Sequence, residues 1–349
     1  MKRDYILLGL FALLAVVFPQ FVENNYYRGV MVEIGIILVL VVGLNLIIGY
    51  AGQISLGHAG FYGMGAFLTM MFTSDRTPLE DWVGSFAGPL VPAAAALHSF
   101  FASHMVLAWI AAAIITGLLA LIVGIPTLRL KGHYLAMATL GLGIILQIVF
   151  KEENLATGGP SGMSVPYFKI MGSEVNPNTA TFYYLVWAVV LASLVLSINL
   201  VHSRIGRALK SIHEDDMAAA ASGVPVMKMK VMIFTVGAMY ASIAGSLYAH
   251  YLTHVNPAPF GFMFSVKLVV MVVVGGMGSI WGSIMGTGLL TTMPHFLTVF
   301  EDYEIALYGL VLIVVMIFSP KGLAGLIDSG WKWTRHKLAK EEEGGDGKA

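Results

Sequence analysis

Long apolar runs separated by short polar stretches occupy most of the 349-residue chain. A helix needs roughly 20 mostly apolar residues to cross a bilayer, and ten runs of about that length follow one another. They cover residues 5–22, 30–48, 56–73, 105–128, 133–150, 182–201, 231–252, 263–277, 279–298 and 304–319. The pattern predicts an all-α fold: a polytopic integral membrane helical bundle of about ten transmembrane helices.

Basic residues fix the expected orientation of this bundle in the lipid bilayer. With ten spans both termini lie on one side, and fifteen of the 20 Lys and Arg residues fall on that side. Loops rich in Lys and Arg face the cytoplasm. We therefore expect cytoplasmic N and C termini in a multi-pass membrane protein. Residues 1–325 form one transmembrane domain, residues 203–230 a cytoplasmic loop within it, and residues 326–349 a cytoplasmic tail.

The two longest loops on the opposite side cover about residues 74–104 and 151–181. The first contains an apolar segment, residues 86–100, which is short for a span and is interrupted by Pro89 and Pro92. If it crossed the membrane, every later loop would change sides and the bias of basic residues would invert. We therefore expect a surface or re-entrant segment.

One polar island, residues 203–230, interrupts the apolar pattern. In its first half Ile205, Leu209 and Ile212 recur at helical spacing, which predicts an amphipathic helix. An acidic trio, residues 214–216, then precedes an Ala-rich stretch that ends at Gly223. Carboxylates favour a helix start and glycine a helix stop, so we expect a break followed by a second, short helix.

Two interpretations of this island remain open from local pattern alone. In the first it is a juxtamembrane loop whose Lys and Arg side chains reach the membrane surface and set topology. In the second it is a docking element for a cytoplasmic partner.

Glycine is dense in two stretches, residues 49–67 and 273–290. In the second, Gly278, Gly282 and Gly286 recur every four residues, a pattern typical of close helix packing. We expect a leucine at position 282 to push the helices apart and an alanine to be tolerated.

The first glycine stretch adds polar side chains at membrane depth. Gln53, Ser55 and His58 alternate with glycines there, and Asn45 precedes them. Such groups suit a broken helix that lines a cavity, so one hypothesis places all four residues along a translocation pathway. The alternative is hydrogen bonding between helices.

The chain lacks the chemistry of several protein classes. It shows no grouping typical of a catalytic site, no His cluster with metal spacing and no Cys, and its net charge of zero gives no case for nucleic-acid binding. We expect no cofactor. Glu33 and Lys267 fall within predicted spans near the external end, and Glu304 begins the last span at that end, so stations for coupling ions are almost absent. The phosphate-binding loop of ATPases is also missing, so uphill transport would need a partner ATPase.

Three stretches, taken together and in order, resemble the signatures of branched-chain amino acid ATP-binding cassette (ABC) transporter permeases of the LivM type. They are GYAGQISLGHAGFYGMGAF, GRALKSIHEDDMAAAASGVPVMKMKVMIFTVGAMYASIAGSLYAH and VVVGGMGSIWGSIMGTGLL, within a resemblance over about residues 30–325. The resemblance implies a multi-pass transport subunit of the bacterial inner membrane that is not itself an enzyme. It also implies a second permease subunit of the LivH type, two cytoplasmic ATPase subunits, and a periplasmic binding protein that delivers Leu, Ile or Val.

By the same resemblance, residues 214–223 correspond to the coupling helix of ABC permeases, which docks in a groove of the ATPase. The residues that match are Glu214, Asp215, Met217, Ala218, Ala219 and Gly223. Met217 stands where the wider importer pattern has Glu, so docking is expected without a charge contact at that position. Relatives that move urea, short amides or other amino acids look similar. The alternatives are a permease for those solutes and, in a different class, a passive channel with the island as a regulatory loop.

Overall fold

A computed structural model describes residues 2–22, 24–75, 77–170, 173–296, 304–319 and 322–325; the predicted tail, residues 326–349, lies outside them. The helices are α1 (Lys2–Phe21), α2 (Asn25–Asn45), α3 (His58–Thr73), α4 (Pro78–Phe86), α5 (Val91–Ser103), α6 (Met105–Thr127), α7 (His133–Glu152), α8 (Asn154–Thr157), α9 (Ala180–His202), α10 (Arg204–Glu214), α11 (Asp216–Ala221), α12 (Val226–Leu252), α13 (Phe262–Gly275), α14 (Ile280–Phe296) and α15 (Glu304–Phe318). Single turns of π- or 3₁₀-helix cover Leu46–Tyr50, Gly88–Leu90, Gly159–Ser161 and Ala258–Phe260. The strands are β1 (Met163–Ser164), β2 (Phe168–Ile170), β3 (Ser173–Val175) and β4 (His254–Val255).

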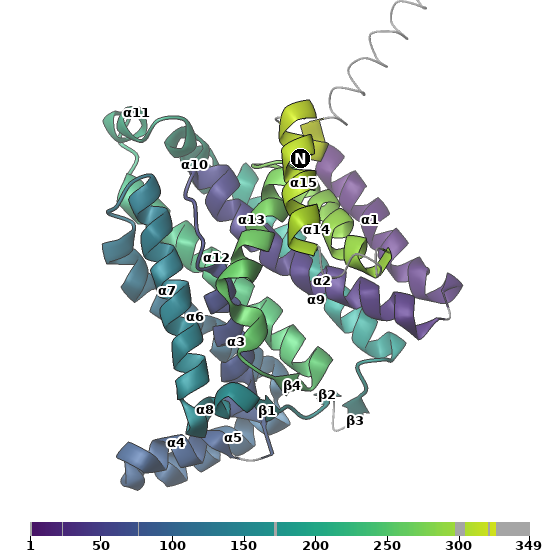
Figure 1. Cartoon of the computed structure of the whole chain (residues 1–349), viewed down its shortest axis with the longest axis vertical. Helices are drawn as coiled ribbons and strands as arrows, with labels where there is room; N and C mark the ends of the chain where they lie inside the picture. The colour runs from purple at the N-terminus through teal and green to yellow at the C-terminus, as the bar shows by residue number, and fades with distance from the viewer. Residues whose placement is uncertain are drawn as a thin grey trace, which may run out of the picture.

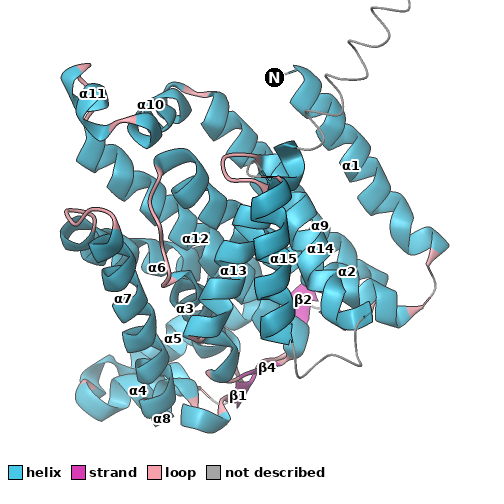
Figure 2. Ribbon diagram, turned by 45° about the horizontal axis from the view of Figure 1, so that its top comes forward, coloured by secondary structure: helices cyan, strands magenta, loops and turns pink. Residues whose placement is uncertain are grey.

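Each of the ten predicted apolar ranges contains a helix, which confirms the all-α polytopic bundle (Figure 2). Among the described residues, seven helices are long and apolar enough to cross a membrane. The other three, α3, α13 and α14, have 16, 14 and 17 residues. At 1.5 Å per residue these helices are about 21–26 Å long, below the roughly 30 Å of a hydrocarbon core. The number of ten crossings therefore stays a prediction.

Helices α2, α3 and α12 form the centre of the bundle, because small residues let their backbones approach. A Cβ built on Gly65 of α3 would overlap the backbone of Ser242 on α12, and one on Gly245 would overlap the Tyr62 carbonyl. Beside this contact the Thr69 hydroxyl donates to Ser246 Oγ at 2.7 Å. Hydroxyl pairs and glycine contacts of this kind hold helices together where lipid removes the hydrophobic driving force.

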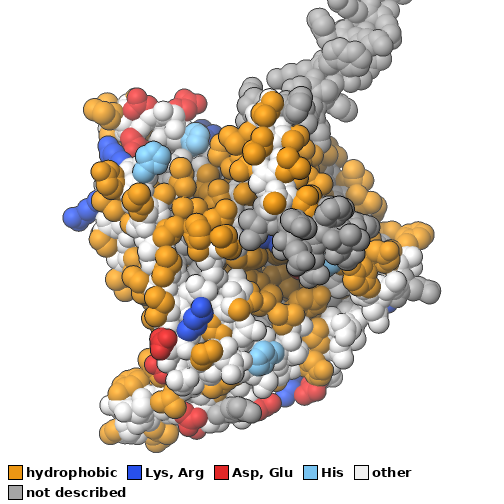
Figure 3. All heavy atoms as spheres, viewed as in Figure 1, with side chains coloured by type: hydrophobic (Ala, Val, Ile, Leu, Met, Phe, Trp, Pro, Cys, Tyr) orange, Lys and Arg blue, Asp and Glu red, His pale blue; other side chains and the backbone are white. Residues whose placement is uncertain are grey.

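The two ends of the bundle differ in character (Figure 1). Helices α10 and α11 lie at one end, and α4, α5, α8 and the strands lie at the other. The start of α1 reaches the α10 end, where Asp4 pairs with His202 at 3.5 Å. Gly322 after α15 reaches it too and packs on Gly276. In Figure 3 hydrophobic side chains cover the flank, and most charged side chains visible there gather at the two ends. This distribution is typical of a membrane protein.

The segment of residues 86–100 does not cross the bundle. It contributes to α4 and α5, and the 13 residues of α5 reach only about 20 Å. His98 on α5 is 2.8 Å from the Ser74 carbonyl, and the Ser74 hydroxyl donates to Ser164 O at 3.2 Å. The two long loops therefore close the same end of the molecule. Short antiparallel pairings of β1 with β4 and β2 with β3, which the sequence did not predict, complete this layer.

Candidate functional site

Helix α10 begins the candidate site directly after the long helix α9. The Ser203 hydroxyl accepts from the backbone N–H groups of Ile205 and Gly206 at 3.1 and 3.3 Å, an N-cap that satisfies donors left free at a helix start. Leu209 and Ile212 are buried, while the basic side chains of the helix face solvent. The predicted amphipathic helix is confirmed.

Helix α11 follows after a single extended residue, Asp215. One carboxylate oxygen of Asp215 accepts from the N–H groups of Met217 and Ala218 at 2.7 and 3.0 Å. These two backbone hydrogen bonds lower the pKa of Asp215, because they favour the charged form. The next carboxylate, Asp216, binds the Lys230 ammonium at 2.5 Å and fastens α11 to the start of α12.

Gly223 ends α11 in the conformation that its sequence position predicts. Its φ of +84° is a left-handed value that glycine adopts most easily. Val224 N–H donates to the Ala219 carbonyl at 3.1 Å and Gly223 N–H to the Ala220 carbonyl at 3.0 Å, the two bonds of a Schellman motif. The predicted order of helix, break, short helix and stop is therefore confirmed.

The exposure of α11 divides the residues matched to a coupling helix. Met217 is 77% exposed, and Glu214 and Ala218 also face solvent, so all three are available to a partner. Ala219 differs, since it is only 3% exposed and packs inside the chain. The part of Ala219 in docking stays a prediction, and its burial favours an indirect part, through the position of the helix.

The break between α2 and α3 lies against α10. A Cβ on Gly52 would meet the His213 imidazole at 3.0 Å, and the Lys210 ammonium lies 5.7 Å from the centre of the Tyr50 ring. Gly52 has a φ of +66°, another left-handed value. Helix α10 therefore contacts the non-helical segment that leads into the bundle, and a movement of α10 would displace this segment.

This segment, residues 52–57, runs inside the bundle rather than around it. Its last residue, Gly57, packs on the backbone of Thr139 in α7. The Thr139 hydroxyl accepts from Leu56 N–H and Ser265 Oγ from Ala59 N–H, both at 3.1 Å. Side chains thus satisfy the free donors at the start of α3, as a helix that begins in a water-poor region requires.

Asn45 ties the end of α2 to the turn between α13 and α14. Its amide NH₂ donates to Ser279 O at 2.8 Å and Ser283 Oγ at 2.7 Å, and its Oδ1 accepts from Gly278 N–H at 3.0 Å. Gly49 lies beside it, where a Cβ would overlap the Gly278 backbone. The two glycine-dense stretches therefore meet in one joint. The contacts of Asn45 are those of the alternative interpretation, hydrogen bonding between helices.

The other three candidate pathway residues have no such partners. Gln53, Ser55 and His58 are buried, and among the described residues none makes a hydrogen bond of normal geometry with their side chains. Buried polar groups normally find partners, so this cluster is suited to a solute or water. Their role along a pathway stays a prediction.

The glycines of the second stretch divide between a turn and a helix. Gly282 and Gly286 lie on α14 against the backbone of α13, where a Cβ on Gly282 would sit 2.5 Å from the Gly275 carbonyl. Gly278 does not continue this helical stripe: it lies in the turn before α14 with a φ of +73°. A Cβ at position 282 would lie within 3.0 Å of three backbone atoms of Gly275 and Gly276, which argues against the expectation that alanine is tolerated there.

The described residues contain no group of three or more His, Cys, Asp or Glu side chains that could hold a metal ion.

The family model described as branched-chain amino acid transport system / permease component matches residues 26–319. The chain belongs to this family. This permease component is 30% identical over 311 residues to the high-affinity branched-chain amino acid transport system permease protein LivM of Salmonella typhimurium, which covers 82% of the chain and 67% of that relative.

Two further relatives extend the comparison. The permease protein LivH of Escherichia coli strain K12 is 25% identical over 298 residues, 82% of the chain and 90% of LivH. A probable LivM of Methanocaldococcus jannaschii is 22% identical over 317 residues, 84% of the chain and 92% of that protein. No solved structure matches the permease. The matched region includes both the α10–α11 element and the joint beneath it.

Proposed function

We propose that this chain is the permease subunit of a bacterial ABC importer that moves branched-chain amino acids into the cytoplasm. Family membership supports the permease role, and the relatives are named for branched-chain amino acid transport. In this proposal a periplasmic binding protein delivers the solute to the chain and a second, LivH-type permease subunit. Two cytoplasmic ATPase subunits supply the energy.

The proposed orientation places the α10–α11 end in the cytoplasm. Most Lys and Arg residues of the sequence belong to the loops and termini expected there, and cytoplasmic loops favour such residues. Both α1 and α15 have an end beside the α13–α14 turn and α10, in agreement with termini on one side. The loops that carry α4, α5 and the strands then face the periplasm.

Coupling in this proposal runs through α11 to the break in α2–α3. Exposed Met217 and Ala218 seat in the ATPase, Asp215 holds the start of the helix, and Gly223 sets the return toward α12. Movement of α10 reaches Gly52 through His213. The joint of α2 with α13–α14 lies next in line, and beyond it the unpaired polar groups of residues 53–58 line the proposed pathway.

Met217 supports the sharpest test of docking, because an exposed methionine in the middle of an interface is a strong anchor. We expect Met217→Ala to weaken retention of the ATPase subunits about 10–30-fold, in line with the roughly 2 kcal/mol of a binding hot spot. Met137→Ala on α7 is the matched control, since Met137 is 68% exposed but lies on another helix. Equal retention by both variants would refute docking through α11.

Uptake tests the substrate class and the mechanism together. A strain that lacks this chain should lose uptake of labelled leucine and regain it with the parent gene, while urea uptake stays unchanged. Restored urea uptake without leucine uptake would favour the urea or amide alternative. Uptake into proteoliposomes without ATP, driven by the gradient alone, would favour the passive channel.

A further inference from the structure

A cavity of about 200 Å³ lies in the half of the bundle opposite α11, and the function above does not use it. Four helices and one short turn line it, which brings together residues far apart in the sequence. The lining residues are Glu33, Ile36, Ile37, Tyr62, Tyr248, Tyr251, Pro259 and Phe264. A water molecule occupies about 30 Å³ in the liquid, so the cavity has room for about seven water-sized groups, which is the size range of a small solute.

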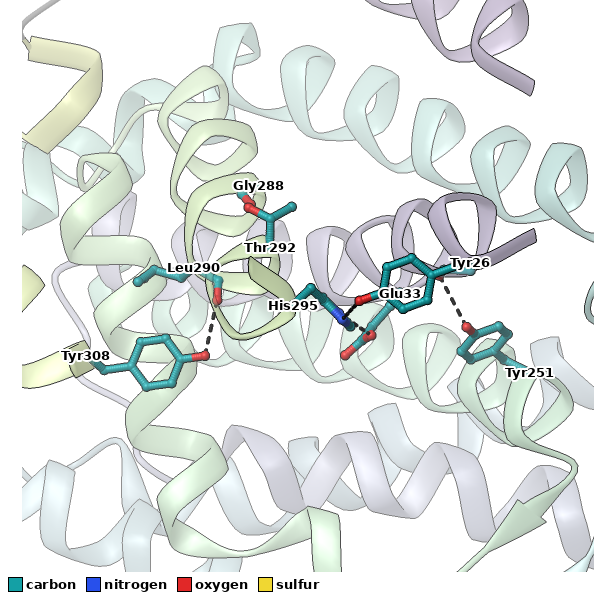
Figure 4. A network of polar contacts seen from close by, with 9 residues as sticks. Tyr26, Glu33, Tyr251, Gly288, Leu290, Thr292, His295 and Tyr308 are labelled. Carbon is teal, nitrogen blue, oxygen red and sulfur yellow. Dashed lines mark hydrogen bonds and ion pairs between the residues drawn. The ribbon is translucent and has the colours of Figure 1, made fainter. Parts of the chain in front are cut away.

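A fixed carboxylate marks one side of the cavity. The Glu33 carboxylate on α2 lies 3.3 Å from Nε2 of His295 on α14, and the Tyr26 hydroxyl lies 3.3 Å from the other ring nitrogen (Figure 4). Tyr251 faces this group from α12 and donates to the Gly29 carbonyl at 3.2 Å. A carboxylate within a predicted span is unfavourable unless it has a partner or a function. His295 orients Glu33, and the half-exposed Glu33 side chain leaves room for a cation.

Two tyrosine hydroxyl groups at the cavity make no hydrogen bond to another described residue. Tyr62 is only 2% exposed, and within the described part of the chain no residue hydrogen-bonds to its hydroxyl or to that of Tyr248. Both tyrosines line the same cavity as Glu33. A phenol can donate a hydrogen bond to an anion, and buried polar groups are seldom left unpaired. The cavity therefore offers an acceptor for a cation and donors for an anion.

The remaining wall is apolar. Ile36 and Ile37 come from α2, and the Phe264 ring stacks on Tyr62 with their centres 5.6 Å apart. A second ring contact, Tyr62 with Tyr248 at 5.3 Å, fixes the two phenols relative to each other. Binding sites for small solutes combine such apolar walls with a few placed polar groups.

We propose that this cavity is a subsite for the transported amino acid itself. Glu33 accepts hydrogen bonds from the α-ammonium group, and the hydroxyls of Tyr62 and Tyr248 donate to the α-carboxylate. Ile37 and Phe264 contact the aliphatic side chain. The inference rests on the proposed function, since it names where that importer holds its solute. A zwitterion with a branched apolar side chain matches the lining group by group.

Leucine uptake by the complete transporter, with its binding protein and ATPases, tests the subsite. We expect Glu33→Gln to raise the KM for leucine at least tenfold, because the amide loses the charge that pairs with the ammonium group. Tyr62→Phe should raise it about threefold or more. Glu152→Gln is the control, since Glu152 is an exposed acid at the end of α7 outside the cavity. ATPase retention should equal that of the parent in all three variants.

A change of specificity separates binding from a merely structural role. Ile37→Ala widens the apolar wall, so the ratio of phenylalanine to valine uptake should rise at least fivefold. A structural defect would lower both rates and leave the ratio unchanged. If Glu33→Gln assembles poorly, cysteine at position 248 gives the readout: the chain has no native Cys, and leucine should protect that thiol from a small reagent.

Different experimental outcomes would overturn the proposed function and the proposed subsite. A parent transporter that does not move leucine, isoleucine or valine overturns the proposed function. A parent that moves leucine, with an unchanged KM in Glu33→Gln and Tyr62→Phe and an unchanged ratio in Ile37→Ala, overturns the subsite alone. Labelling at position 248 that leucine does not slow would overturn it as well.

Discussion

Replacing Gly49 by alanine tests the joint between the two glycine-dense stretches. A Cβ at this position would lie 2.8 Å from Gly278 Cα and closer still to the Gly278 nitrogen and to Asn45 Oδ1. Two of these three atoms belong to the backbone, so no side-chain rotation can relieve the overlap. The π-helical turn would have to move away from the α13–α14 turn, and the hydrogen bond from Gly278 to Asn45 would lengthen or break.

The expected loss of stability is the sum of the cost of this overlap and the loss of this hydrogen bond. Overpacking in a close-packed interior costs about 1–3 kcal/mol, and an interhelical hydrogen bond within a membrane contributes about 0.6–1.7 kcal/mol. Together they reduce the free energy of unfolding by about 2–4 kcal/mol. A chain of this length has an unfolding entropy of about 0.7 kcal/mol per kelvin, so the apparent Tm should fall by about 3–6 °C.

Thermal denaturation of the purified chain, followed by the fraction that stays monodisperse after heating, measures this change. Gly141→Ala is the matched control: Gly141 lies within α7, and apart from the adjoining backbone of its own helix no atom lies within 4 Å of the position of its Cβ. Alanine stabilises a helix interior by about 0.5–1 kcal/mol relative to glycine, so this variant should gain stability. The two substitutions should therefore have opposite signs. A Gly49→Ala variant as stable as Gly141→Ala would refute the close contact.

Three further predictions follow from the same structure. Gly282→Ala should lower the Tm by about 1–4 °C, because the new methyl group meets the Gly275 and Gly276 backbone; an unchanged Tm would restore the view that alanine fits there. Asp215→Ala should uncouple ATP hydrolysis from uptake, whereas Asp215→Asn, which keeps a cap acceptor, should not. Because the pKa of Asp215 is lowered, its contribution to the cap is complete at neutral pH and is lost as pH falls through that pKa. In intact cells cysteine at position 174 should react with an impermeant reagent and cysteine at position 211 should not; equal labelling would invert the topology.

Local chemistry explains why the α10–α11 element could be predicted from sequence. The signals that begin and end these helices act over two to five residues: an acceptor at Ser203, an acceptor at Asp215, and a glycine at position 223. No distant part of the chain is needed to form them. The burial of Ala219 had no such signal, because an Ala-rich run shows no polar and apolar face. Packing against α12, to which Lys230 fastens α11, selects the buried side.

Glycine periodicity was less informative, because one spacing serves two structures. A glycine every four residues is typical of close helix packing, and Gly282 and Gly286 pack in that way. Gly278 keeps the same spacing but lies in a turn, with Gly276 at a φ of +119° beside it. A side chain at either position would be strained, which accounts for glycine without a helix. The strands could be predicted from sequence even less well, because β1 and β4 are two residues each and pair across the whole of α9 to α12.

The cavity beside Glu33 depends on contacts between spans that no single span reveals. Glu33 lies near the external end of its predicted span, so a side chain that reaches for water accounted for it fully. Its contact with His295, and the convergence of Tyr62 and Tyr248 on one small volume, depend on four helices that no sequence spacing relates. Charged groups are scarce in the predicted spans, so ion-coupled transport is not the leading hypothesis. The same scarcity makes Glu33, a carboxylate beside a solute-sized cavity, the group most able to distinguish an amino acid from a neutral solute such as urea, because only the amino acid brings an ammonium group to pair with it.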